Sequence, residues 1–261
     1  MRALWADPAS SVRRAALPAI GLIGWEAAAR SGLFSPLIVP SITRIGYQLW
    51  VLAIQPESLV ELWHTIARGL SGFALAAVVG VALGIWMGRS AAAAGCLGPI
   101  FSSTYPIPKI ALFPIFIYLF GIGSLSKVLL VFLECLYPIA ITTQAGGRGV
   151  NRVLVWSAAN MGASRARILW SVVVPATAPF AFAGFRIAMP IAMIVVIITE
   201  MISSADGLGY LAMYALASFK TDRMLAVVVA IGFLGLGLDR LLVLMRDRLV
   251  VWERLDSYYA G

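Results

Sequence analysis

Long apolar runs alternate with short polar segments along this chain. The runs cover approximately residues 15–29, 62–87, 97–120, 127–143, 180–202 and 224–245. A helix needs about 20 apolar residues to cross a bilayer, so the pattern predicts about six transmembrane helices, the first of them short for a span. No linker rich in glycine, serine or proline divides the chain. We therefore expect an all-α membrane protein with a single transmembrane domain over residues 1–261.

A basic segment interrupts this pattern between about residues 146 and 179. Apolar residues recur at helical spacing on both sides of Gly162, and glycine tolerates the left-handed turn that ends a helix. Ser164 is placed to cap the next helix. The pattern is typical of two short amphipathic helices that form a docking surface, and it also fits an ordinary basic cytoplasmic loop. Its four arginines, with no acidic residue among them, are Arg148, Arg152, Arg165 and Arg167.

This basic segment resembles the cytoplasmic loop signature of permease subunits of ATP-binding cassette importers. That signature reads Glu-Ala-Ala, three residues, Gly, nine residues, an aliphatic residue, one further residue, and Leu-Pro. Ala158 and Gly162 match it, and Pro175 follows Gly162 at the expected distance. The chain departs from the signature at Trp156, which stands where the glutamate is usual, and at Ser157 and Val174.

Longer stretches resemble the nitrate, sulfonate and taurine branch of these importers, among them YPIPKIALFPIFIYLFGIGSLSKV and ITEMISSADGLGYL. The resemblance covers roughly residues 17–249 and implies a type I importer permease bundle in a bacterial inner membrane. It implies a homodimer, two ATPase subunits that hold ATP and magnesium, and an external substrate-binding protein. The implied substrate is a small anion such as a sulfonate or nitrate, or a vitamin or pyrimidine precursor. The ATPase-coupling residues that it implies are Trp156, Ala158, Gly162, Ser164, Arg165, Arg167, Ile168 and Pro175.

Composition and charge support a membrane protein. Hydrophobic residues make up 61% of the chain and charged residues 12%, which is too apolar for a soluble domain. The net charge of +8 is dispersed among apolar runs, so we expect no nucleic-acid partner. Eleven basic residues fall on one predicted side and five on the other, and the richer side is normally cytoplasmic. Both termini are therefore expected in the cytoplasm. The eleven are Arg2, Arg13, Arg14, Arg89, Arg148, Arg152, Arg165, Arg167, Arg246, Arg248 and Arg254, and the five are Arg30, Arg44, Lys127, Lys220 and Arg223.

The sequence offers no catalytic or metal-binding motif. The single histidine, His64, has no nucleophile pattern around it, and Cys96 and Cys135 lack metal-ligand spacing. No Gly-x-x-x-x-Gly-Lys-Ser/Thr sequence is present to bind a nucleotide. We expect a non-catalytic subunit that binds no cofactor itself.

Two features mark a candidate substrate path. Prolines interrupt the third run, so its first half should not form a regular helix. Membranes tolerate irregular backbone only where it is buried against protein or lines a wet cavity, so this segment is a candidate wall of the path. The alternative is a proline-kinked helix that only packs against its neighbours. Acidic residues at membrane depth are costly and usually paired. Glu200 and Glu134 could line a gate, or form buried pairs with Arg186 and Lys109 respectively. The candidate path or gate residues are Pro106, Pro108, Lys109, Glu134, Gln144, Arg186 and Glu200.

A stripe of small residues completes the prediction of packing. Gly80, Gly84 and Gly88 recur every four residues in the second run, which would let a neighbouring helix approach closely.

Two other classes of function stay open at this point: an ion-coupled secondary transporter that uses the membrane acids, and a non-transporting membrane assembly factor.

Overall fold

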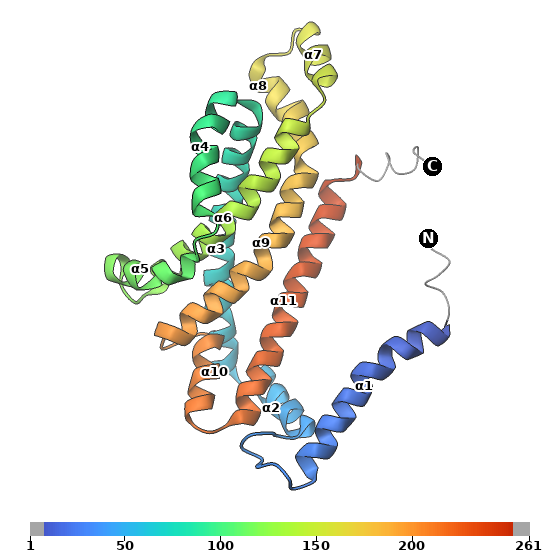
Figure 1. Ribbon diagram of the computed structural model, residues 1–261, viewed down its shortest axis with the longest axis vertical. Helices are drawn as coiled ribbons and strands as arrows, with labels where there is room; N and C mark the ends of the chain where they lie inside the picture. The colour runs from blue at the N-terminus through green and yellow to red at the C-terminus, as the bar shows by residue number, and fades with distance from the viewer. Residues whose placement is uncertain (1–7, 253–261) are drawn as a thin grey trace.

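The computed structural model describes the backbone of residues 8–252 and the side chains from residue 16 onward. Every element in that range is helical (Figure 1). The helices run in the order α1 (Pro8–Arg30), α2 (Ile42–Ile54), α3 (Pro56–Arg89), α4 (Ala91–Thr104), η2 (Lys109–Leu112), α5 (Phe113–Phe120), α6 (Ser124–Gly149), α7 (Arg152–Asn160), α8 (Arg165–Ile168), η3 (Leu169–Val173), α9 (Val174–Ser203), α10 (Leu208–Ala217) and α11 (Thr221–Leu249). The predicted all-α fold is confirmed.

Four helical segments in the described residues are long and apolar enough to cross a membrane: α3, α6, the continuous stretch Arg165–Ser203, and α11. A fifth crossing is possible if α4 and the η2–α5 segment, bent by 85° relative to each other, form one broken span. The run at 15–29 lies within α1, which does not meet these criteria. Figure 1 shows α1 extending away from the bundle, which it joins through α2. A sixth crossing at α1 stays a prediction.

The centre of the bundle is formed by α3, α6 and α9. Their contact buries an apolar cluster that includes Ala76, Leu130, Ile139 and Val196. The predicted glycine stripe lies on this contact. A Cβ atom added at Gly84 would come within 2.5 Å of Thr143 Cβ and 2.7 Å of the Ala140 carbonyl oxygen. The backbones of α3 and α6 therefore approach more closely than any larger residue would allow.

Two expectations about helix boundaries are wrong. The predicted run at 180–202 does not start a new helix at Pro179, because Arg165–Ser203 is one continuous helical stretch. The second predicted loop helix, α8, has only four residues and continues through the π-helical turn η3 into α9. Pro175 has no N–H group to donate to the preceding turn. A π turn shifts the hydrogen-bond pattern by one residue, which lets the stretch continue past the proline.

The third run breaks later than predicted. Its first half is the regular helix α4, with Pro99 inside it, and the irregular backbone begins after Thr104. Pro106 and Pro108 lie in the connection to η2, where the backbone turns toward α5. The third run is interrupted between α4 and η2, so the expectation of an irregular first half is wrong.

Candidate functional sites

The turn between α7 and α8 has the geometry that its sequence predicts. Asn151 caps α7 by accepting a hydrogen bond from the Val153 N–H at 2.9 Å. Gly162 has φ +79°, in the left-handed region, and Ser164 Oγ accepts a hydrogen bond from the Arg167 N–H at 3.3 Å. Figure 1 shows this turn protruding beyond the ends of α4 and α6. Local sequence therefore fixes a rigid projection at one end of the bundle.

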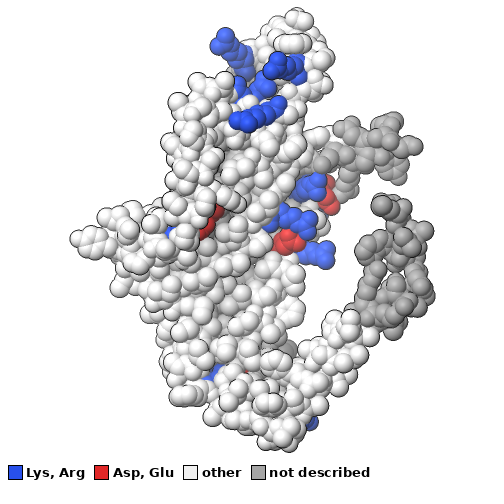
Figure 2. Space-filling model, viewed as in Figure 1, with Lys and Arg blue, Asp and Glu red and all other residues white. Residues whose placement is uncertain are grey.

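This projection is available for contact. No residue of α7 is buried, and Trp156 is 61% exposed. Arg165 and Arg167 are exposed, while Ala158, Ile168 and Pro175 are half-buried and face their own chain. Figure 2 shows basic atoms gathered at this end of the molecule, with no acidic atoms beside them on the visible face. An exposed tryptophan on the same projection as arginines that have no ion-pair partner among the described residues is typical of a surface that receives another protein.

Lys109 and Glu134 come together at the break in the third run. The lysine Nζ lies 4.0 Å from Glu134 Oε2 and donates to the carbonyl oxygens of Tyr105 at 3.2 Å and Ile107 at 3.3 Å. It also lies 4.2 Å from the centre of the Tyr137 ring. The predicted Lys109–Glu134 pair is confirmed. The lysine ammonium group supplies hydrogen bonds to two backbone carbonyl oxygens that lie at the break, outside regular helix.

Glu200 has a different partner from the one predicted. Its carboxylate accepts hydrogen bonds from Arg68 Nη1 at 2.9 Å, Thr65 Oγ1 at 2.8 Å and the Gly209 N–H at 3.1 Å. Both side chains of the Arg68–Glu200 pair are almost fully buried. Arg186 instead lies 3.1 Å from Asp239 on α11 and is largely exposed. The expected Glu200–Arg186 pair is therefore wrong.

Arg68 is the residue that sequence reasoning missed. Besides Glu200 it binds Asp206 Oδ1 at 2.7 Å and Ser124 Oγ at 2.9 Å, and so joins α3 to α6, α9 and the turn before α10. Burial alone would raise the pKa of Asp206, but the hydrogen bond and charge of Arg68 lower it below its ordinary value. The available signal was a single arginine inside an apolar run, which in a membrane helix normally has a buried acidic partner.

The candidate path residues do not form one site. Gln144 lies ten residues after Glu134 on α6, which places it about 15 Å further along the helix axis. Glu200 belongs to the Arg68 network, and Arg186 faces α11. Only Pro106, Pro108, Lys109 and Glu134 are close together, around the break in the third run. No group of three or more potential metal ligands occurs in the described part of the chain.

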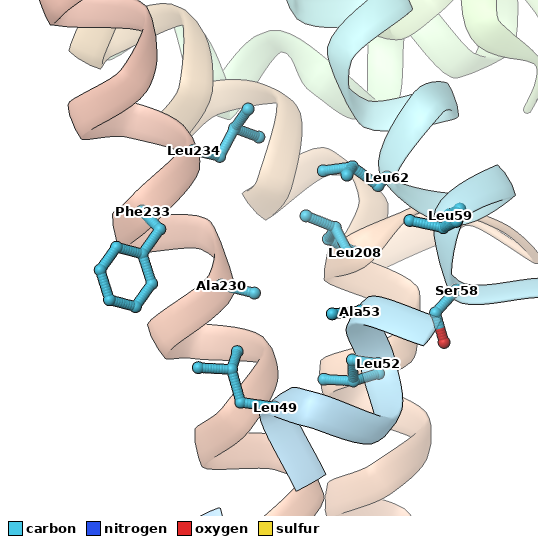
Figure 3. A pocket seen from close by; sticks show the side chains of 10 residues that line it. All are labelled: Leu49, Leu52, Ala53, Ser58, Leu59, Leu62, Leu208, Ala230, Phe233 and Leu234. Carbon is cyan, nitrogen blue, oxygen red and sulfur yellow. The ribbon is translucent and has the colours of Figure 1, made fainter. Parts of the chain in front are cut away.

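A cavity of about 460 Å³ lies between α2, α3, α10 and α11 (Figure 3). Leucine side chains surround it, and Ser58 is its one polar lining residue. A small anion would find no charged group there. The lining residues are Leu49, Leu52, Ala53, Ser58, Leu59, Leu62, Leu208, Ala230, Phe233 and Leu234.

A bundle of membrane-length helices with a protruding, capped helix–turn–helix at one end fits the class of transporter permease subunits. The model of the family described as binding-protein-dependent transport system inner membrane component matches residues 80–251. The chain belongs to this family, and it is a permease subunit of an ATP-driven, binding-protein-dependent importer. This membership decides against the secondary transporter and the assembly factor.

Related proteins agree with this assignment. A putative ABC transporter permease protein of Methanocaldococcus jannaschii is 33% identical over 94% of this chain and 93% of its own length. The taurine transport system permease protein TauC of Escherichia coli is 32% identical, covering 90% of this chain and 87% of its own. The nitrate import permease protein NrtB of Synechocystis is 28% identical, covering 93% and 90%. A solved structure of the MetNI methionine ABC transporter matches with TM-score 0.61 at 19% identity, over 72% of this chain and 92% of that chain, which shows a common fold.

Proposed function

We propose that this chain forms the membrane path for import of a small sulfonate or nitrate-type anion. The relatives named for taurine and nitrate transport support this substrate class. Two copies would assemble with two ATPase subunits, which hold ATP and magnesium, and with an external binding protein that selects the substrate. The chain itself then contributes no catalytic group and no cofactor.

The observation that carries the coupling role is the capped α7–α8 projection and its helical continuity with α9. ATP-driven closure of the ATPases would move this projection, and with it the bundle, because α8 continues without a break into α9. The bundle would then change from inward-facing to outward-facing, and the binding protein would release substrate into it. This is alternating access, in which the differential contacts of the ATPases drive the change of state.

The Arg68–Glu200 network also argues for this mechanism. A proton- or ion-coupled path needs a membrane acid that can exchange its partner, whereas the Glu200 carboxylate already has three hydrogen-bond donors. We expect Glu200 to hold helices together, with the gate formed elsewhere. The Lys109–Glu134 pair at the broken span is the better candidate for a wall of the path.

Reconstitution tests the proposal directly. The chain, its ATPase and its binding protein would be placed in liposomes, and uptake of labelled taurine, an alkanesulfonate and nitrate would be measured with ATP inside or outside. We expect uptake of one of these anions that requires both the binding protein and ATP on the ATPase side. Uptake driven by an ion gradient without ATP would contradict the proposal.

A further inference from the structure

A second pocket, of about 710 Å³, lies beside α7, where the membrane-length helices α3 and α6 end. We call it the arginine pocket. Arg89 closes α3, Arg148 stands in the last turn of α6, and Arg152 begins α7. Its volume falls within the range of small-ligand sites, about 300–1,000 Å³. The full lining is Met87, Gly88, Arg89, Ser90, Ala91, Ala94, Arg148, Val150, Arg152, Val155 and Trp156.

The charges of this pocket have no counterpart in the described part of the chain. No acidic residue lines it, and Arg89, Arg148 and Arg152 have no ion-pair partner among residues 16–252. All three arginines are exposed, so solvent partly screens their mutual repulsion, and an anion bound between them would neutralise it. Guanidinium groups bind phosphate oxygens through paired hydrogen bonds, so phosphate fits this arrangement well. Ser90 Oγ accepts from the Ala93 N–H at 3.2 Å, which leaves its hydroxyl hydrogen free to donate.

The position of the pocket identifies the source of the phosphate. Its floor is formed by Met87 at the end of α3 and by Ala91 and Ala94 in the first turn of α4. These helices leave the apolar layer at this level, so the pocket lies at the depth of the lipid headgroups. Trp156 on α7 lines one edge of the pocket and is 61% exposed, so an ATPase that used this side chain would lie beside the bound ligand. Basic pockets between membrane helices typically bind anionic headgroups.

We propose that the arginine pocket binds the phosphate of an anionic phospholipid. The bound lipid would neutralise the three arginines and pack beside α7. It would thereby stabilise the orientation of the coupling projection. This inference does not depend on which substrate the importer carries.

The test uses the purified full chain, stripped of lipid in detergent and analysed by native mass spectrometry. Phosphatidylglycerol and phosphatidylcholine would be titrated separately, with inorganic phosphate as a competitor. We expect phosphatidylglycerol to bind about 10- to 100-fold more tightly than phosphatidylcholine. The triple variant R89Q/R148Q/R152Q should lose this preference, and the matched control R165Q/R167Q, with its changes outside the pocket, should keep it.

Three outcomes would overturn the proposal. One is an unchanged lipid preference in the triple variant. Another is complete displacement of phosphatidylglycerol by an equal concentration of inorganic phosphate, which would indicate a site for the free ion. The third is loss of the ATPase from the triple variant with lipid binding intact, which would assign the pocket to protein docking. If the triple variant is not monodisperse, R89Q alone should show a smaller loss of the same preference. The first two outcomes do not bear on the proposed import function, which ATP-driven uptake tests separately, whereas loss of the ATPase would also lower that uptake.

Discussion

At the scale of single residues, the buried Arg68–Glu200 pair should contribute strongly to stability. Removing one partner of such a pair typically costs about 3–5 kcal/mol when the remaining charge is left without compensation. Arg68 would keep its ion pair with Asp206 at 2.7 Å, so we expect a cost below that range here. Glu200→Gln keeps the shape of the side chain but removes its charge. We therefore expect a clearly lower thermal unfolding temperature for the purified protein in detergent.

Glu134→Gln is the matched control for this substitution. Glu134 Oε2 lies 4.0 Å from Lys109 Nζ, and its side chain is more exposed than that of Glu200. Its loss should lower the unfolding temperature less. A Glu200→Gln protein that unfolds at the wild-type temperature but transports poorly would instead support the original hypothesis that Glu200 is a gate residue.

Asp206 should make stability depend on pH. Its pKa is lower in the folded protein than in the unfolded chain, where aspartate titrates near about 3.9. The folded state therefore binds fewer protons, so its stabilisation is complete above the unfolded pKa and is lost as pH falls through the folded pKa. We expect the unfolding temperature to fall below about pH 5, and to fall less steeply in Asp206→Asn. Parallel curves for the two proteins between pH 6 and pH 3 would contradict this prediction.

Residues whose roles depend on near neighbours could be predicted from the sequence. Gly162 and Ser164 form the expected turn and cap, because both interactions lie within three positions along the chain. The partner of Glu200 could not be predicted in the same way, because Arg68 is 132 positions away and helix packing brings the two together. The sequence pattern predicted that the Glu200 carboxylate is paired, but only the fold shows that its partner is Arg68.

At the scale of helices, the glycine stripe should control the packing of α3 on α6. A valine at Gly84 would place its Cβ 2.5 Å from Thr143 Cβ, and backbone atoms of α6 block any simple adjustment. Gly84→Val should separate the two helices and lower both the yield of folded protein and its unfolding temperature. Gly232→Val is the control, since a Cβ at that α11 glycine meets nothing within 4 Å. If both variants lose yield and unfolding temperature to a similar extent, the loss comes from placing valine in a helix and not from the close contact of α3 with α6.

Hydropathy located the membrane helices but not where each one ends. The predicted runs at 62–87, 127–143, 180–202 and 224–245 all lie inside longer helices. Prolines were read as helix ends, yet Pro99 lies inside α4 and Pro179 inside α9. A proline within a helix costs one hydrogen bond and a local clash, and packing of the helix against its neighbours can offset that loss. Packing of this kind is not visible in a single sequence.

At the scale of the whole molecule, the fold makes a prediction about orientation. Figure 1 shows α11 ending on the side of the bundle that carries α7 and α8, with α10 at the opposite end. The excess of basic residues predicts that the α7–α8 end lies in the cytoplasm. Reporter domains fused at Gly261 and inserted at Gly162 should therefore report the cytoplasm, and one inserted at Asp206 should report the outside. Signals from the same side at Gly261 and Asp206 would contradict this orientation.

The assembled importer should depend on Trp156 for attachment of its ATPase. A glutamate at this position would form an ion pair, whereas an exposed tryptophan offers a large apolar face and one N–H donor. Burial of such an anchor contributes roughly 2–4 kcal/mol, while an exposed rim charge such as Arg165 or Arg167 contributes under about 1 kcal/mol. Trp156→Ala should release the ATPase from purified membranes, and added salt should weaken the wild-type complex only modestly.

Two matched variants make this last prediction specific. Trp156→Phe keeps an aromatic face and should retain most of the ATPase, because apolar burial and not the N–H donor supplies most of the attachment. Trp170→Ala removes a tryptophan that is equally exposed, at 70% against 61%, but lies beyond the α7–α8 turn, so it should leave the complex intact. The measurement is the amount of ATPase that co-purifies with each variant, together with ATP-driven uptake. If Trp156→Ala keeps both at the wild-type level, docking does not use an aromatic anchor, and the arginines of the projection become the remaining candidates for that contact.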